Sequence, residues 1–302
     1  MLAEETMIKK ILLITLFTLS SHLSAKETLI IGTYDSFSSE WGPGPEIELK
    51  FEEICNCDVQ YVATNQAGSL NSNIFKKGKD ILLGVEVNDF NEDDSDYWAK
   101  YDYGYFAFIF NKNNIQSPPN SFEELASNND LKIVVQDPRT SPVGLGLLRW
   151  MKNIYPDSFF ENFKQIDDQI ITYTPGWSEA YGMFLDNKAD LVLSYSTSPF
   201  YHREYEDEYK YEALIFEEGH LITEELILVN KDIKNFDLAK SFVDFMLTED
   251  IQKIISSKNI MYPVDKNAMP EKMSQLDVPN KLVAKELDTE KLISEWLKAS
   301  ID

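Results

Sequence analysis

The chain has 302 residues, with 28 Lys and Arg against 51 Asp and Glu, which gives a formal charge of −23. Hydrophobic residues make up 43% and aromatic residues 13% of it, too much for a disordered acidic tail. The charge argues against nucleic acid or an anionic membrane as a partner, because both require a basic face. Two Cys and three His exclude a cluster-rich metalloprotein, although they leave room for one small metal site. The length favours two domains or lobes.

The N-terminal segment has the three parts of a secretory signal. Lys9 and Lys10 precede the apolar run 11–19, and small residues follow as far as Ala25. The run is too short to span a bilayer. We expect cleavage after Ala25. The acidic stretch before Met7 is atypical of a signal, so Met7 is a candidate start.

Taken in chain order, the expected elements alternate between strands and helices. In the first half, strands are expected at 28–34, 59–63, 80–87, 103–110 and 131–136, with helices at 46–53, 69–77, 121–126 and 144–154. In the second half, strands are expected at 170–174, 190–195 and 221–229, with helices at 178–185, 237–248, 249–257 and 289–298. This alternation predicts an α/β protein with parallel sheets and with ligands at the carboxyl ends of the strands.

The first loop of interest follows the strand 28–34. Tyr34 and Asp35 stand at the carboxyl end of that strand, where such sheets bind ligands. The alternative is structural, with Asp35 capping a turn and Tyr34 packing in the core. On this loop alone the structural alternative is the simpler one.

The second loop, 136–146, leads into a helix. Ser141 can cap this helix, Pro142 can occupy its first position, and nearby glycines keep backbone N–H groups accessible. The pattern is typical of an anion cradle at a helix N-terminus, and the missing P-loop Lys argues against nucleotide hydrolysis. An ordinary proline-capped helix explains the spacing equally well.

The third group places a Trp before a helix, and hydroxyls with tyrosines after a strand. Its members are the aromatic residues Trp177, Tyr195 and Tyr201 and the hydroxyl residues Ser196, Thr197 and Ser198. Stacked aromatics with hydroxyl donors suit a flat, cationic ligand that carries oxygen substituents. The alternative is packing in the core, which we accept for the neighbouring Tyr181 and Phe200.

The cysteines and histidines form no catalytic set. Cys55 and Cys57 are as compatible with a strained local disulfide as with two half-buried thiols at the end of a helix. One His lies in the signal, and His202 adjoins Tyr201, a pair that could contribute to an iron site. His220 is expected to be a surface or hinge residue.

Several blocks together resemble the periplasmic thiamine-binding proteins of ABC importers. They run in order along nearly the whole mature chain, at 34–37 with 41–45, 55–57, 102–108, 136–141, 176–181, 194–199, 261–264 and 293–296. The resemblance implies an α/β, two-lobed type II periplasmic-binding-protein fold with two crossover strands, near 103–110 and 221–229, and a ligand in the cleft. It implies a signal peptide at 1–25, lobe 1 from 26–107 and 226–302, and lobe 2 from 108–225.

The resemblance also implies the residues that bind the ligand. Tyr34, Trp177 and Tyr201 match aromatics that stack on it, and the thiazolium cation of thiamine gains roughly 0.5–2 kcal/mol per such contact. Ser141 and Pro142 match the segment that reaches its hydroxyethyl or phosphate end.

The facing lobe contributes a further loop, Tyr195, Ser196, Thr197 and Ser198. Asp35 is our own addition, as a partner for the thiazolium or aminopyrimidine ring.

The chain departs from the family pattern at three places. Ile260 stands where the family usually has Trp, Gln66 and Ala67 replace the usual Asp-Gly pair, and the stretch between Val87 and Tyr101 is short by a helix or more. We therefore expect a smaller first lobe and an altered cleft, which leaves phosphorylated thiamine or a thiamine precursor as alternative ligands.

The leading interpretation is a monomeric periplasmic receptor without a cofactor. It captures thiamine, or thiamine mono- or diphosphate, by lobe closure and delivers it to an inner-membrane ABC permease. One alternative is a thiamine-cleaving enzyme of the same fold, which would need a Cys nucleophile. Another is a ferric-ion receptor that uses Tyr195, Tyr201 and His202.

Overall fold

A computed structural model describes residues 26–64, 70, 72–231, 233–285 and 287–301, so the predicted signal peptide lies outside the described residues. The first elements are β1 (Glu27–Tyr34), α2 (Asp35–Ser38), α3 (Gly44–Cys55), β2 (Cys57–Thr64), β3 (Ile81–Glu86), the 3-10 turns η1 (Val87–Asp89) and η2 (Glu92–Asp94), and β4 (Ser95–Asn111). The middle elements are α4 (Phe122–Ser127), β5 (Ile133–Gln136), α5 (Pro142–Ile154), α6 (Phe159–Asp167), β6 (Ile170–Thr174), α7 (Trp177–Leu185), β7 (Leu191–Tyr195), α8 (Pro199–Tyr205) and β8 (Tyr211–Ala213). The last are β9 (His220–Asn230), α9 (Phe236–Met246), α10 (Glu249–Ile254), the π-helical turn η3 (Ile255–Asn259), β10 (Tyr262–Pro263), η4 (Lys266–Ala268), α11 (Glu271–Ser274), β11 (Lys281–Leu282) and α12 (Thr289–Ile301).

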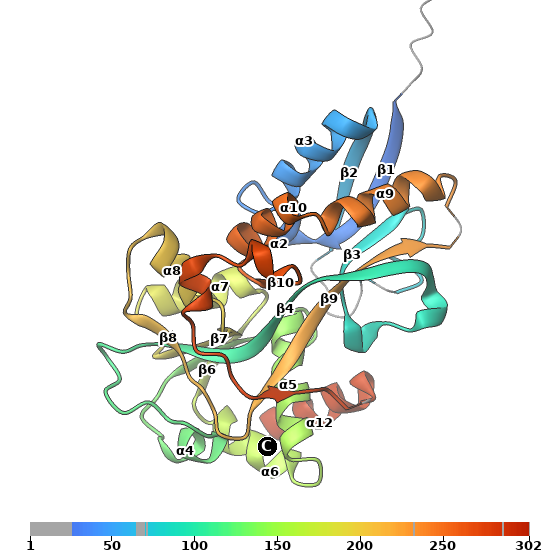
Figure 1. Ribbon diagram of the computed structural model, residues 1–302. Helices are drawn as coiled ribbons and strands as arrows, with labels where there is room; N and C mark the ends of the chain where they lie inside the picture. Colours follow the sequence, from blue (N-terminus) through green and yellow to red (C-terminus); the bar gives the residue numbers. More distant parts are fainter. Residues whose placement is uncertain (1–25, 65–69, 71, 232, 286, 302) are drawn as a thin grey trace, which may run out of the picture.

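Two strands carry the chain from one half of the molecule to the other. The main strands are ordered β2-β1-β3-β9-β4-β7-β5-β6, and β9 and β4 are antiparallel neighbours at the centre (Figure 1). β4 pairs with β9 over its first part and with β7 from Phe106 to Phe110. The predicted two-lobed α/β fold with two crossover strands is therefore confirmed.

Each half has its own hydrophobic core. One cluster gathers around Phe51, Phe242 and the strands β1 and β3, with α3 and α9 packed on it. The other gathers around Phe108, Trp150 and Phe163, in the half that contains α5 and α6, which Figure 1 draws below β1 and β3. Because helices cover these strands, the strands are largely apolar, and β3 is buried at all six positions, including Glu86.

The position of α12 bears on the predicted lobe boundaries. Figure 1 shows this helix beside α5 and α6, and its residues Leu292, Trp296 and Ala299 join the cluster around Phe163. The prediction assigns α12 to lobe 1 because it follows the second crossover strand. The boundaries at 107/108 and 225/226 themselves stay predictions.

Most of the expected elements form, and their local causes are visible. Ser121 Oγ accepts a hydrogen bond from the backbone N of Glu124 and caps α4, as predicted. The Glu124 carboxylate accepts from the backbone N of Asn120, one residue before the cap, so the reciprocal bond is displaced by one position.

The helix expected at 69–77 is wrong, since the described residues of that stretch form turns and bends. Ser72 Oγ accepts from the backbone N of Phe75, and Gly78 has a φ of +74°. In the described part of the chain, no helix is long and apolar enough to cross a membrane.

Candidate functional site

Trp177 is held in one orientation at the start of α7. Its indole Nε1 donates to Ser194 Oγ over 2.7 Å, and its ring stacks on Tyr181 with centroids 4.7 Å apart. Ser194 Oγ in turn lies 2.7 Å from Ser198 Oγ. The half-buried indole is therefore fixed by hydrogen bonding and stacking before any ligand arrives.

The segment after β7 buries three hydroxyl residues in succession. Ser196, Thr197 and Ser198 are 1%, 0% and 5% exposed. Ser196 interacts with the Tyr262 hydroxyl, whereas the hydroxyl of Thr197 has no hydrogen-bond partner. Buried hydroxyls are nearly always paired in folded proteins, so the Thr197 hydroxyl is the exception in this segment.

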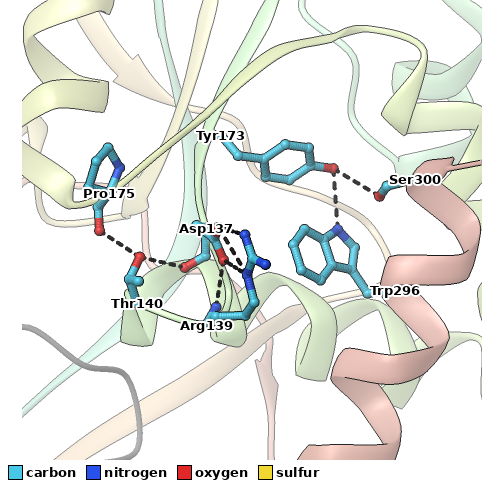
Figure 2. Close-up of polar contacts among 7 residues, drawn as sticks. All are labelled: Asp137, Arg139, Thr140, Tyr173, Pro175, Trp296 and Ser300. Carbon is cyan, nitrogen blue, oxygen red and sulfur yellow. Dashed lines mark hydrogen bonds and ion pairs between the residues drawn. The ribbon is translucent and has the colours of Figure 1, made fainter.

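The loop before α5 is tied to the loop before α7. Figure 2 shows Thr140 Oγ1 donating to the carbonyl oxygen of Pro175 over 2.8 Å, while Arg139 forms an ion pair with Asp137. The two loops that carry Ser141 and Trp177 are thus fixed relative to each other.

The α5 N-terminus forms only part of the predicted pattern, and the anion cradle stays a prediction. Ser141 is buried, but its side chain makes no capping hydrogen bond to the helix, so the predicted cap is wrong. Gly144 follows in the first turn, where a Cβ would lie 2.3 Å from the carbonyl oxygen of Gln136. Pro142 occupies the first helical position and is exposed.

Figure 2 also shows Trp296 on α12 donating from Nε1 to the hydroxyl of Tyr173 over 3.3 Å. The guanidinium of Arg139 lies 5.6 Å from the Trp296 ring, within the range of a cation–π contact. The helix α12 therefore supports the loop before α5 through these contacts.

Tyr34 ends β1 on the opposite side of the crossover strands. Its hydroxyl donates to Glu225 Oε2 over 2.9 Å and lies 3.1 Å from Asn259 Oδ1. Its ring packs on Gly84, where a Cβ would come within 2.3 Å of the ring and where φ is +93°. Glycine is required at position 84 for both reasons.

The other predicted residues of this half contribute less to the site. Asp35 is exposed in the first turn of α2. Gln66 and Ala67 lie outside the described residues. All three stay predictions.

A row of three buried carboxyl groups crosses the centre of the sheet. Glu225 on β9 is directly opposite Glu86 on β3 and Asp102 on β4. These residues are 9%, 6% and 0% exposed. Directly opposed side chains of neighbouring strands lie on the same face, so the three acids, hereafter the acidic row, are side by side.

Hydrogen bonds hold each end of the acidic row. Glu225 accepts from the hydroxyls of Tyr34 and Tyr101, and Asn259 Nδ2 donates to Asp102 Oδ2 over 2.7 Å. Arg149 on α5 donates to Glu86 over 3.3 Å, and it donates to Asp89 over 2.5 Å.

Burial dominates the ionisation of the acidic row. It raises the pKa of Glu86 to about 8, although the charge of Arg149 opposes this. Burial also raises the pKa of Asp102, with the charge of Glu225 adding to the effect, and it raises the pKa of Glu225 although Tyr101 and Tyr34 donate to that carboxylate.

Tyr195 connects the acidic row to the other half of the site. Burial raises the pKa of its phenol, and the charges of Glu225, Glu86 and Asp102 raise it further, in that order. Tyr195 also lies against Gly104 on β4, where a Cβ would be 3.6 Å from its ring and 2.9 Å from Met261. Tyr34 of one half thus donates directly to the acidic row, and Tyr195 of the other half contacts β4 two residues beyond Asp102.

Sequence reasoning missed these acids because three distant segments contribute one each. The available signal was an acidic residue next to apolar residues in each of three predicted strands, which is uncommon in a buried strand unless the charge has a partner or a function.

The segment before Met261 is strained. Ile260 has a φ of +57°, a region that β-branched residues rarely adopt, and it follows Asn259, which bonds to the acidic row. Ile260 also joins a cluster with Tyr105, Phe200 and Tyr262. The strain therefore lies beside the site.

His202 is unsuited to binding iron. Its side chain is 1% exposed, with Nε2 3.0 Å from the Tyr181 hydroxyl and Nδ1 2.6 Å from Glu206. Tyr201, by contrast, is 44% exposed. Both ring nitrogens of His202 are engaged, so the geometry argues against the predicted iron alternative. In the described residues, no group of three or more His, Cys, Asp and Glu is arranged to hold a metal ion.

His220 is not a surface residue, so that part of the expectation is wrong, and its role as a hinge stays a prediction. It is fully buried, with Nδ1 2.7 Å from the carbonyl oxygen of Phe106 and Nε2 accepting from the backbone N of Phe216 over 2.8 Å. The ring stacks near Trp150. It is a neutral structural link between the crossover strands and the chain that precedes β9.

Cys55 and Cys57 form a disulfide with their Cα atoms 5.1 Å apart, so of the two alternatives the bridge is confirmed. Asn56 between them adopts the left-handed conformation that lets the chain turn from α3 into β2. Both cysteines of the sequence are thereby oxidised, and neither is a free nucleophile in this state.

Comparison with known proteins agrees with this architecture. A family model described as bacterial extracellular solute-binding protein matches residues 67–284. The thiamine-binding periplasmic protein of Escherichia coli (strain K12) is 36% identical, over 97% of this chain and 99% of its own length. That of Salmonella typhimurium is 38% identical, over 84% of this chain and 86% of its own.

Solved structures give the same result. One described as a periplasmic thiamin binding protein superposes with a TM-score of 0.83 at 35% identity, covering 92% of this chain and 97% of its own. The periplasmic binding protein AfuA from Actinobacillus pleuropneumoniae, at 17% identity, shares the fold with a TM-score of 0.69 over 91% of this chain and 99% of its own. The resemblance seen in the sequence is confirmed, and the chain belongs to the family of bacterial extracellular solute-binding proteins.

Proposed function

We propose that this chain is a periplasmic receptor that binds thiamine between its two halves and delivers it to an inner-membrane ABC permease. The observation that supports the proposal is the buried acidic row, to which Tyr34 of one half donates a hydrogen bond, on the same two central strands that lead to Tyr195 of the other half. Thiamine is a flat organic cation, so it suits aromatic faces backed by carboxylates. The names of the relatives support the same ligand.

The remaining predicted residues contact different parts of the ligand. Trp177 and Tyr201 stack on its rings, and the hydroxyls of Ser196 and Thr197, the second of which has no partner in the protein, bond its polar atoms. The N-terminus of α5 at Ser141 receives the hydroxyethyl group or a phosphate, because its first-turn N–H groups are not capped by the Ser141 side chain. Thiamine mono- and diphosphate are therefore ligands as well.

The protein works as a monomer and breaks no bond. Closure of the two halves gives affinity because both sides contact the ligand only when shut. The disulfide removes both thiols from nucleophilic attack, which disfavours the thiamine-cleaving alternative.

Calorimetry with thiamine, its mono- and diphosphate and the free aminopyrimidine tests the proposal. Saturable binding of thiamine at one molecule per chain is the expected result, with the aminopyrimidine alone binding more weakly. Chromatography of the same mixtures is expected to recover intact thiamine. Release of free pyrimidine would replace the receptor with an enzyme, and absence of thiamine binding would end the proposal. A charge-transfer band on adding ferric ion would instead favour the iron receptor.

A further inference from the structure

The acidic row is an arrangement that folding alone does not favour. Like charges directly opposite each other on neighbouring strands destabilise a sheet, and buried carboxylates lose their hydration. Here Glu86, Glu225 and Asp102 combine both costs on three adjacent strands. Such an arrangement is expected where a site needs the charge.

One oxygen atom of the acidic row has no hydrogen-bond partner. Asp102 Oδ1 is buried and makes no hydrogen bond, although Asp102 Oδ2 accepts from Asn259. Thr223 stands two residues before Glu225 on β9, so its side chain is on the same face, where it interacts with Glu86. The unpartnered Asp102 oxygen is independent of the charge argument and indicates that a polar group is to be received there.

The groups that face the acidic row leave part of its charge without a counter-ion. From α5, Arg149 contacts Glu86 and also Asp89 of η1. The neighbours from β1, β4, β7 and η3 are Tyr34, Tyr101, Tyr195 and Asn259, all neutral. Lys100 pairs instead with Glu224, whose position next to Glu225 places it on the other face of the strand.

We propose that Glu225 and Asp102 are the anionic part of the ligand site, and that an organic cation bound between Tyr34 and Tyr195 displaces a proton from them. This inference rests on the proposed thiamine function and adds a specificity determinant to it. One proton leaves as the cation enters, so the charge in the site is conserved and no bond of the ligand changes.

The physical basis is linkage between proton and cation. Burial raises the pKa of both Asp102 and Glu225, so the unliganded pair retains a proton at a higher pH than exposed carboxyls do. A nearby cation stabilises the ionised form and lowers the pKa. The proton is then released to solvent, and affinity for the cation rises with pH by up to about tenfold per unit for each proton displaced.

Calorimetry of thiamine binding to the wild-type protein, in buffers of different ionisation enthalpy, measures this proton directly. We expect net proton release and rising affinity between pH 6 and 8. The neutral analogue in which carbon replaces the charged ring nitrogen of thiamine is expected to bind without proton release or pH dependence. Equal behaviour of the two ligands would overturn the inference while leaving the receptor function in place. A wild-type protein that does not bind thiamine would instead refute the proposed function.

Variants assign the proton to residues. Glu225→Gln and Asp102→Asn are expected to lower thiamine affinity about tenfold or more and to reduce proton release, with little effect on the neutral analogue. The matched control is Glu224→Gln, which removes a charge from the other face and should leave both quantities unchanged.

Unchanged proton release in both Glu225→Gln and Asp102→Asn would remove the pair from the site. If one of these variants does not fold, the comparison of thiamine with its neutral analogue on the wild-type protein still decides the question.

Discussion

Acidification should destabilise the protein through His220. This side chain is buried and engaged at both nitrogens in its neutral form, and burial lowers its pKa to about 4 from the ordinary value near 6.5. Its neutral form is favoured in the folded state, so the unfolded state binds the extra proton. The stability that this residue contributes is therefore complete above about pH 6.5 and is lost as the pH falls toward 4.

The two pKa values give the size of the effect. Linkage between 6.5 and about 4 predicts a loss of about 2 kcal/mol at pH 5 and about 3 kcal/mol at pH 4, relative to pH 8. Urea unfolding of the wild-type protein and of His220→Gln over this range measures it. Other carboxyls titrate in both proteins, so the quantity of interest is the difference between the two curves.

The difference in unfolding free energy between the wild type and His220→Gln should narrow as the pH falls, because only the wild type has the imidazole to protonate. Parallel curves from pH 8 to pH 4 would refute the argument. If His220→Gln is too unstable to measure, proton NMR of the wild-type imidazole replaces it. A midpoint near 6.5 for this ring in the folded protein would contradict the reasoning in the same way.

Four further substitutions test other features. Trp177→Ala should lower thiamine affinity about tenfold or more, from lost cation–π and apolar contact, and Trp177→Phe should lose less; unchanged calorimetric binding would remove the residue from the site. Arg149→Met should cost about 3 kcal/mol of unfolding free energy by leaving buried acids unpaired, and an unaltered urea midpoint would contradict this. Gly84→Ala should destabilise by more than about 2 kcal/mol through positive φ and contact with an aromatic ring, and a normal melting temperature would exclude that strain. Serine at both Cys55 and Cys57 should cost only about 1.5 kcal/mol because the loop is so short, and failure to fold would show a larger role.

Local patterns predicted the fold well where a single segment contains the signal. The capping pair Ser121 and Glu124 and the apolar strand 28–34 each specify their structure within a few residues. The helix α6 was missed although Phe159, Phe163 and Ile166 repeat at helical spacing and are buried.

The site could be predicted only in part, because some of its residues come together through strand register rather than through a local pattern. Family resemblance points to the loops around Trp177 and Tyr195, which are contiguous in sequence. The acidic row depends instead on strand register, including irregularities between Leu83 and Val85 and between Lys100 and Asp102. A slip of one residue would turn each acid to the other face, and sequence patterns do not determine register to that accuracy.

The docking of α12 has a consequence for how this chain folds. Trp296 donates to Tyr173, 123 positions earlier, and shares a hydrophobic cluster with Phe163. The half of the molecule that contains α5 and α6 cannot bury that cluster fully until α12 has packed against it. A chain that crosses a membrane N-terminus first thus keeps an incomplete core throughout transit, and its final packing waits for the C-terminus to emerge.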